Sequence, residues 1–318
     1  MACGVENEKF RPYTLQTRSG NEIWYFQTLM TVTNFNSFTE MLSLFENINR
    51  WLSDGGITAK SDRFRLQLKA VQIAAKAEER NNLIEYMQGV DPEQRATLLW
   101  AITELTELGD VYKAFPVIDS ALSEKIRIAM SGPSSQKLEN STNNAARNTM
   151  FELGLAARMK RGGLQVDIGQ ENPDIIVSVP SGTIFVQCKR PLSSRTVREN
   201  VNSAATQLRR DLKSAKQSFG VIALSMSKSL LELGEFRITS HEAGAHAFAE
   251  QARLEVERHR KDWSNVGDKN VVGVLFHAIY PVAVTETHSM MAAQTIVHSS
   301  IAGRRTQPFD ELVQRLPE

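Results

Sequence analysis

The segment GTIFVQCKRP, residues 182–191, places an amide and an ammonium group in an otherwise apolar, strand-like run. Side chains alternate between the two faces of a strand, so Gln187 and Lys189 point the same way and Cys188 points the other way. One face of this segment is therefore typical of a hydrophobic core, with Cys188 as a core thiol. The other face carries polar groups that could bind and activate a polar substrate.

A second strand-like run, DIIVSV at residues 174–179, is followed by the turn-forming triplet PSG at residues 180–182, which predicts a tight hairpin. If the last two residues of the triplet form the loop, Asp174 lies opposite Lys189. A register shift of two residues would keep the same side chains on one face, whereas a slip of one residue would separate them. We therefore expect Asp174, Gln187 and Lys189 to cluster at the open end of the hairpin.

The preceding segment, residues 145–161, predicts a helix that ends at the glycine pair 162–163. Glu152 lies on the same side of this helix as Leu155 and Met159. A carboxylate in an apolar stripe is costly unless a charged group meets it. Two carboxylates, an amide and a lysine are thus expected to converge. Such oxygen ligands suit Mg²⁺, and a metal-bound water beside a lysine suits attack on a phosphodiester.

Glu152, Pro173-Asp174 and Gln187-Cys188-Lys189 resemble the motif of the PD-(D/E)xK nuclease superfamily, which includes restriction endonucleases, Holliday-junction resolvases and RecB-type nucleases. The resemblance covers residues 146–226 and includes the expected order of helix, three strands, helix and strand. It implies an α/β fold with a restriction-endonuclease-like αβββαβ mixed-sheet core.

The resemblance also implies the chemistry. DNA phosphodiesters would be hydrolysed with one or two Mg²⁺ ions, for which Mn²⁺ could substitute. Asp174, Glu152 and the backbone carbonyl of Cys188 would be metal ligands, and Lys189 would orient or activate the water. Gln187 departs from the family pattern, in which Glu or Asp is usual here, although similar Gln variants occur in Mrr-like restriction nucleases. An amide offers oxygen without charge, so we expect weaker metal binding or a single ion.

The segment after the motif is basic. Residues 189–216 hold eight Lys and Arg against one Glu and one Asp, which indicates contacts to a phosphate backbone. The alternative is an ordinary solvated helix face. The candidate nucleic-acid contacts are Arg190, Arg195, Arg198, Gln207, Arg209 and Arg210.

Element patterns change along the chain. Residues 37–130 have helical periodicity, with a capping box at Ser37 and Glu40, whereas residues 131–145 are rich in Ser, Asn, Gly and Pro. We therefore predict a mainly α-helical accessory domain over residues 1–135 and a nuclease domain over residues 136–318. Beyond the motif, the patterns predict helices over 196–217 and 241–263 and strands over 221–226 and 270–280, and they leave the last forty residues unassigned.

The composition fits a soluble, folded protein. The 318 residues are 42% hydrophobic and 23% charged, with a net charge of +1, so a nucleic-acid surface would have to be a local patch. The two cysteines, Cys3 and Cys188, argue against a disulfide framework. The sequence has neither a signal-like N-terminal segment nor an apolar run of membrane-spanning length. We expect a cytoplasmic protein with no membrane partner.

The leading hypothesis is a metal-dependent DNA endonuclease. Its helical domain would bind substrate, form a homodimer or contact a partner subunit. Nucleases of this class with helical appendages are frequent effectors of antiphage defence. Two alternatives stay open: an RNA-directed nuclease, and a nucleic-acid-binding or scaffold protein that lost turnover with the Gln187 replacement.

Overall fold

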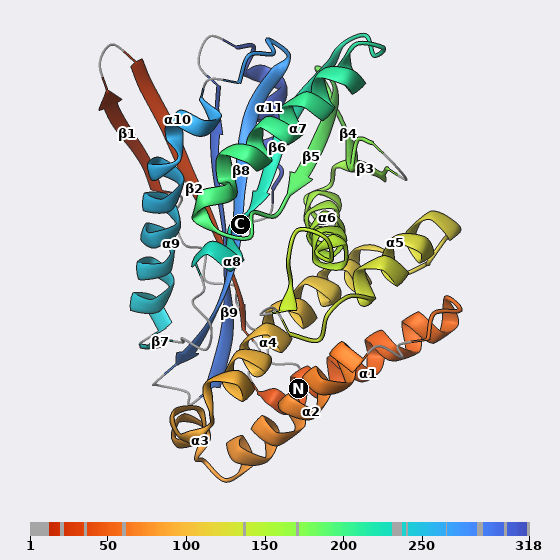
Figure 1. Cartoon of the computed structure of the whole chain (residues 1–318), viewed down its shortest axis with the longest axis vertical. Helices are drawn as coiled ribbons and strands as arrows, with labels where there is room; N and C mark the ends of the chain where they lie inside the picture. Colours follow the sequence, from red (N-terminus) through yellow and green to blue (C-terminus); the bar gives the residue numbers. More distant parts are fainter. Residues whose placement is uncertain are drawn as a thin grey trace.

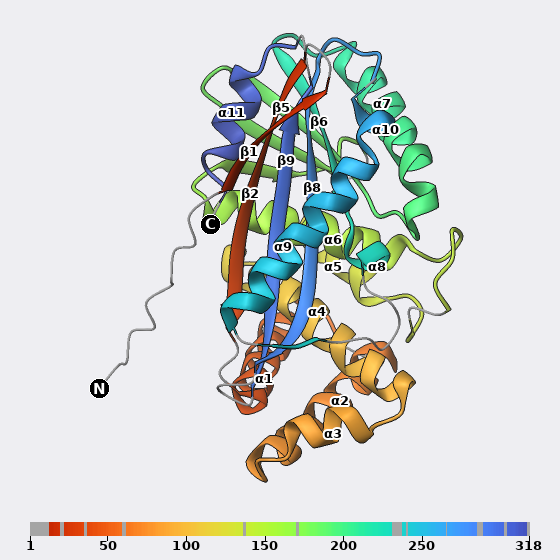
Figure 2. The same ribbon diagram turned by 90° about the vertical axis from the view of Figure 1, so that its left-hand side faces the viewer.

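The described part of the chain forms a nine-stranded mixed sheet with helices on both faces (Figures 1 and 2). The strand order is β1-β2-β9-β8-β6-β5-β4-β3, and β7 pairs with β8 outside this path. The computed structural model describes residues 13–19, 22–34, 37–58, 62–135, 138–169, 172–230, 237–239, 241–264, 266–284, 289–301 and 304–316.

The strands are β1 (Tyr13–Ser19), β2 (Glu22–Asn34), β3 (Gln165–Ile168), β4 (Ile175–Val179), β5 (Gly182–Lys189), β6 (Ser218–Ser225), β7 (Arg237–Thr239), β8 (Val271–Val284) and β9 (Ser289–Ser300). The helices are α1 (Phe38–Asp54), α2 (Asp62–Glu79), α3 (Leu83–Gly89), α4 (Pro92–Ala114), α5 (Ser120–Met130), α6 (Ala145–Arg161), α7 (Val197–Leu212), α8 (Ser227–Leu230), α9 (His241–Arg258), α10 (Arg260–Trp263) and α11 (Gln307–Val313), with a 3₁₀ turn η2 (Ser194–Thr196) before α7.

The side chains of β6 divide the core into two layers. Val221 and Ala223 belong to the cluster that includes α4, α6 and α11, whereas Ile222 and Leu224 belong to the cluster that includes α7, α9 and α10. β6 is parallel to both β5 and β8, and all of its residues are buried. Burial on both faces is usual for parallel strands, which are covered by helices on each side.

The α/β class expected from the sequence is confirmed, and α6, β3, β4, β5, α7 and β6 follow one another in the expected order. The predicted helix starts are also present. Ser37 Oγ accepts from the backbone N–H of Glu40 at 3.0 Å, as the capping box requires. The last forty residues, for which no element was predicted, contain β9 and α11.

The helical and α/β parts of the chain are built around shared cores. Each of the two hydrophobic clusters contains residues from both sides of the boundary predicted at residue 135. In addition, β2 pairs with β9 from Gln27↔His298 to Asn34↔Met291, so the segment before the helices belongs to the same sheet as the nuclease-like motif.

The β4–β5 hairpin differs from the predicted register by two residues. Val179 lies opposite Gly182, so residues 180–181 form the loop and the predicted pairing of Asp174 with Lys189 is wrong. Gly182 has φ +145° and a Cβ there would lie 2.4 Å from the carbonyl oxygen of Gln217, which explains why glycine opens the strand instead of closing the loop. A shift of two residues preserves the face, and Asp174 now falls beside Gln187.

Three acidic residues of α4, at a spacing of three, face basic residues of α2 and α6. Glu104 pairs with Arg63 of α2 at 2.7 Å and with Arg147 of α6 at 2.8 Å. Two turns along, Asp110 pairs with Arg158 at 3.5 Å and with Arg161. Glu107 lies between them and would be the neighbour of any side chain at Gly154 of α6.

Burial on its own would raise the pKa of Glu104, but the guanidinium groups of Arg63 and Arg147 outweigh burial and lower that pKa to about 2. Its ion pairs are therefore present at neutral pH, and their contribution to stability is lost as the pH falls from the ordinary glutamate pKa towards 2. Glu104 thus ties α2, α4 and α6 together by charge.

Replacing Glu104 with Gln should lower the free energy of unfolding at pH 7 by about 3–5 kcal/mol, because two buried guanidinium groups lose their counter-charge. Urea denaturation measures this change. The control is Arg65→Gln, which breaks an exposed ion pair with Asp62 and should cost less than about 1 kcal/mol. Equal effects of the two substitutions would contradict a structural role for Glu104.

Candidate active site

Asp174 lies immediately before β4, and the two hydrogen bonds of its side chain converge on a single oxygen. Oδ2 accepts from Gln187 Nε2 at 2.5 Å and from the backbone N–H of Cys188 at 2.7 Å. Asp174 and Gln187 are only 6% and 1% exposed. Burial, followed by repulsion from Glu152, raises the pKa of Asp174 to about 6, and the Cys188 N–H, Lys189 and Lys125 offset part of that rise.

Glu152 lies on α6, is almost fully buried, and pairs through Oε2 with Lys125 Nζ at 2.8 Å. Lys125 belongs to α5, in the helical segment that precedes the linker. The charged partner expected for a carboxylate in an apolar stripe is thus present. Because Glu152 raises the pKa of Asp174 while Lys125 and Lys189 lower it, these four charged groups act on one another at one end of β4 and β5.

Gln187 presents an oxygen with nothing bound to it. Its Oε1 is buried and has no hydrogen-bond partner among the described residues, whereas its Nε2 donates to Asp174. Lys189, two residues further on, is half-buried. An unsatisfied buried amide oxygen is costly, and an added cation would relieve that cost.

Cys188 is a buried free thiol on the opposite face from Gln187, as predicted. Burial, with Asp174 and Glu152 nearby, raises the pKa of the thiol well above its ordinary value. The thiol is therefore inert as a nucleophile, and the residue acts on the site through its backbone.

The groups at this site fit a hard divalent cation only in part. Among the described residues, no group of three or more His, Cys, Asp and Glu side chains is arranged to hold a metal. The oxygen donors available are the Asp174 carboxylate, the Glu152 carboxylate, which is close enough to raise the pKa of Asp174, and Gln187 Oε1, which has no partner among the described residues. Two carboxylates, an amide oxygen and waters form an acceptable ligand set for Mg²⁺, and a bound cation would offset the burial and the repulsion from Glu152 that raise the pKa of Asp174.

The predicted nucleic-acid contacts divide into two groups. The four arginines Arg195, Arg198, Arg209 and Arg210 are exposed on η2 and α7, next to the candidate site in the chain. Gln207 is half-buried, and its Oε1 has no partner among the described residues. Arg190 is not on this surface. It is 5% exposed and paired with Glu139, because strand alternation turns it to the same side as Cys188. The prediction of a surface contact at Arg190 is therefore wrong.

Lys125 is the site residue that sequence reasoning missed. It precedes Glu152 by 27 residues and reaches it through the packing of α5 on α6. No local motif marks this contact. The available signal was the unpaired carboxylate in the stripe of α6, which required a cation without identifying it.

Comparisons with protein-family models, with curated proteins and with solved structures give no match to this chain. None of the described helices is both long and apolar enough to cross a membrane.

Asp174→Asn should stabilise the metal-free protein at about pH 8, because it removes a buried charge and leaves an oxygen to accept from Gln187 and Cys188. The rise in pKa from 3.8 to about 6 corresponds to at most about 3 kcal/mol, at 1.36 kcal/mol per pKa unit. The wild type loses this stability as the pH rises from 3.8 through about 6, so the two proteins should be alike near pH 4.

Urea denaturation of both proteins at the two pH values checks this expectation. Asp167→Asn, at an exposed position on β3, is the matched control and should have little effect. A gain of stability at both pH values, or a loss at about pH 8, would contradict a destabilising charge at Asp174.

Proposed function

We propose that this protein is a metal-dependent nuclease that hydrolyses DNA phosphodiester bonds. The observation that carries the proposal is the convergence of Asp174, Gln187, Lys189 and Glu152 at one end of β4 and β5. These are the residues that the PD-(D/E)xK resemblance assigns to the site. They arrive there from a helix and two strands in the chain order that the family uses.

In this proposal the chain holds Mg²⁺ through Asp174, Glu152 and Gln187 Oε1, with the backbone carbonyl of Cys188 as a further ligand. The bound ion would supply Lewis acidity and lower the pKa of a coordinated water. Lys189 would donate to that water or to a phosphate oxygen and offset charge as it develops. Gln187 fixes Asp174 by donating to Oδ2 at 2.5 Å and adds no negative charge, which favours a single ion.

The substrate assignment rests on the arginines that follow the site. The elements that directly follow β5, η2 and α7, carry four exposed arginines that could contact a phosphate backbone: Arg195, Arg198, Arg209 and Arg210. An internal position of DNA is the favoured target, and an effector role in antiphage defence is compatible with it. Backbone contacts alone do not distinguish DNA from RNA, so RNA is the second substrate to assay.

One observation favours a different class of function. Glu152 is already neutralised by Lys125 at 2.8 Å, and Gln187 carries no charge, so the site has less negative charge to offer a metal than the family pattern provides. A nuclease-fold protein that binds nucleic acid without cutting it is the alternative. The two proposals differ in what happens when Lys189 is removed.

Lys189→Ala should reduce Mg²⁺-dependent cleavage of supercoiled plasmid by about 100-fold or more, the usual cost of losing a group that stabilises transition-state charge. Plasmid nicking with Mg²⁺, Mn²⁺ or EDTA measures the loss, and single-stranded DNA and RNA are assayed in parallel. Lys76→Ala on α2 is the control for general loss of positive charge.

DNA affinity, measured by fluorescence anisotropy, should change little in Lys189→Ala. A metal-dependent activity that persists in Lys189→Ala would place the active site elsewhere. Wild-type DNA binding without cleavage in any metal would favour the binding protein.

Gln187→Glu should strengthen metal binding because it restores the usual acidic ligand. In EDTA the variant should melt below the wild type, since a further carboxylate is buried beside Asp174 and Glu152. Added Mg²⁺ should raise its melting temperature more than that of the wild type, by mass action on a tighter site. Differential scanning calorimetry with and without Mg²⁺ checks this. An equal Mg²⁺ effect on both proteins would mean that residue 187 does not face the metal.

A further inference from the structure

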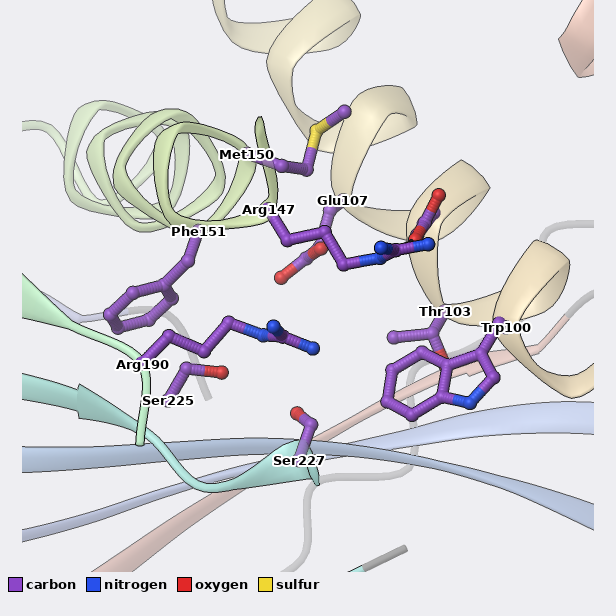
Figure 3. A pocket seen from close by; sticks show the side chains of 10 residues that line it. Trp100, Thr103, Glu107, Arg147, Met150, Phe151, Arg190, Ser225 and Ser227 are labelled. Atoms are coloured by element: carbon purple, nitrogen blue, oxygen red, sulfur yellow. Dashed lines mark hydrogen bonds and ion pairs between the residues drawn. The ribbon is translucent and has the colours of Figure 1, made fainter. Parts of the chain in front are cut away.

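A cavity lies at the carboxyl ends of the parallel strands β5 and β6, where α4 and α6 close over them (Figure 3). Arg190 follows β5, and Ser225 and Ser227 lie at the end of β6 and the start of α8. The crevice beyond the carboxyl ends of parallel strands is a common place for ligands in α/β proteins. The other lining residues are Trp100, Thr103, Glu104, Glu107, Arg147, Met150 and Phe151.

Two buried guanidinium groups point into this cavity with donors to spare. Arg147 and Arg190 are 4% and 5% exposed, and Figure 3 shows both side chains reaching into the hollow. Arg147 Nη1 and Arg190 Nη2 have no hydrogen-bond partner among the described residues. A buried charged donor without a hydrogen-bond partner is energetically costly, so an acceptor bound at each of these nitrogens would be stabilising.

Other donors of both arginines are held by protein acceptors, of which Glu104 also lines the cavity. Arg147 Nε donates to Glu104 at 2.8 Å, and Arg190 Nη1 donates to Glu139, which also pairs with Lys228 at 3.0 Å. These pairs hold the guanidinium planes in place while the free nitrogens face the cavity. Preorganised arginine forks of this kind match the oxygen atoms of phosphate and carboxylate groups.

The size of the cavity restricts the ligand. Its volume, including the part open to solvent, is about 290 Å³. This volume is near the lower end of the range for ligand pockets, so the cavity admits only a small group. A small tetrahedral oxyanion is of that size, and Ser225 and Ser227 line the cavity together with the two arginines (Figure 3).

We propose that this cavity is a binding site for a small oxyanion of the phosphate type, held by Arg147 and Arg190 with the hydroxyls of Ser225 and Ser227. The ligand is free inorganic phosphate or the phosphate of a mononucleotide. The site is separate from the candidate nuclease centre, and its existence does not depend on phosphodiester hydrolysis.

Glu107 gives the site a dependence on pH. Burial, followed by repulsion from Glu104, raises the pKa of Glu107 to about 7. Protonation of Glu107 removes a negative charge from the cavity wall, so an anion should bind more tightly below this pKa. Near this pKa, binding of the anion should be accompanied by uptake of a proton at Glu107. The charged groups that act on Glu107 are Glu104 of α4, Arg63 of α2, Arg158 of α6 and Arg190 after β5.

The test is isothermal titration of the full chain with sulfate at constant ionic strength, with chloride as the balancing ion. Sulfate keeps its charge across the relevant range, so any pH effect comes from the protein. Binding should be tighter at about pH 6 than at about pH 8, on either side of the pKa of Glu107 at about 7. Inorganic phosphate and a 5′-mononucleotide are then titrated to identify the source of the phosphate group.

Two substitutions should act in opposite directions. Ser225→Ala should weaken sulfate binding by about tenfold, the loss expected for one hydrogen bond to a charged group. Glu107→Gln should tighten binding at about pH 8 and abolish the difference between the two pH values. Ser229→Ala on α8, whose hydroxyl donates to the Met226 carbonyl, is the matched control and should bind as the wild type does.

The outcomes separate clearly. Sulfate binding that Ser225→Ala weakens and Ser229→Ala preserves would establish the site, whether or not the protein cleaves DNA. A mononucleotide that binds more tightly than inorganic phosphate would identify a phosphomonoester as the ligand. Wild-type protein that binds none of the three anions, or equal affinity in both serine variants, would overturn the proposal.

Discussion

The carboxylate of Glu104, held between Arg63 and Arg147, is the constraint on which the arrangement of the helices depends. All three side chains are buried, so each would be strongly destabilising without the others. Apolar helix faces can slide against one another at modest cost. Buried ion pairs allow only one relative position of the helices, because any shift would leave a buried charge without its partner. The position of α6 on α4 is fixed in this way, and α6 carries Glu152 to the end of β4 and β5.

The candidate site combines an energetic cost with a fixed geometry. Asp174 is buried and is close enough to Glu152 to be affected by its charge, and its raised pKa of about 6 means that the ionised carboxylate opposes folding near neutral pH. The two donors on Oδ2 hold the carboxylate in a single orientation, and the free oxygen of Gln187 lies in the same group. Such a combination of cost and order is typical of sites built for a ligand.

Local patterns predicted the elements but not how distant elements meet. Strand alternation placed Asp174, Gln187 and Lys189 on one face, and helix periodicity identified Glu152, because both depend on neighbours in sequence. The predicted hairpin register was wrong by two residues. Gly182 opens the strand because a side chain there would collide with the carbonyl oxygen of Gln217, the residue just before β6, and this contact is not visible in the local sequence. Lys125 reaches Glu152, and β2 reaches β9, through long-range contacts that no local pattern encodes. Arg190 was assigned to the surface from its charge alone, whereas alternation along β5 turned it inward.

The pairing of β2 with β9 has a consequence for biogenesis. Residue 27 pairs with residue 298, so β2 leaves the ribosome long before its hydrogen-bonding partner exists. Until β9 is made, a thirteen-residue strand has one unpaired edge that could add to another chain. The helices between them can pack as they emerge, because their contacts are closer in sequence. Completion of the sheet is therefore a late event in synthesis, and nascent chains of this protein should depend on protection of that edge.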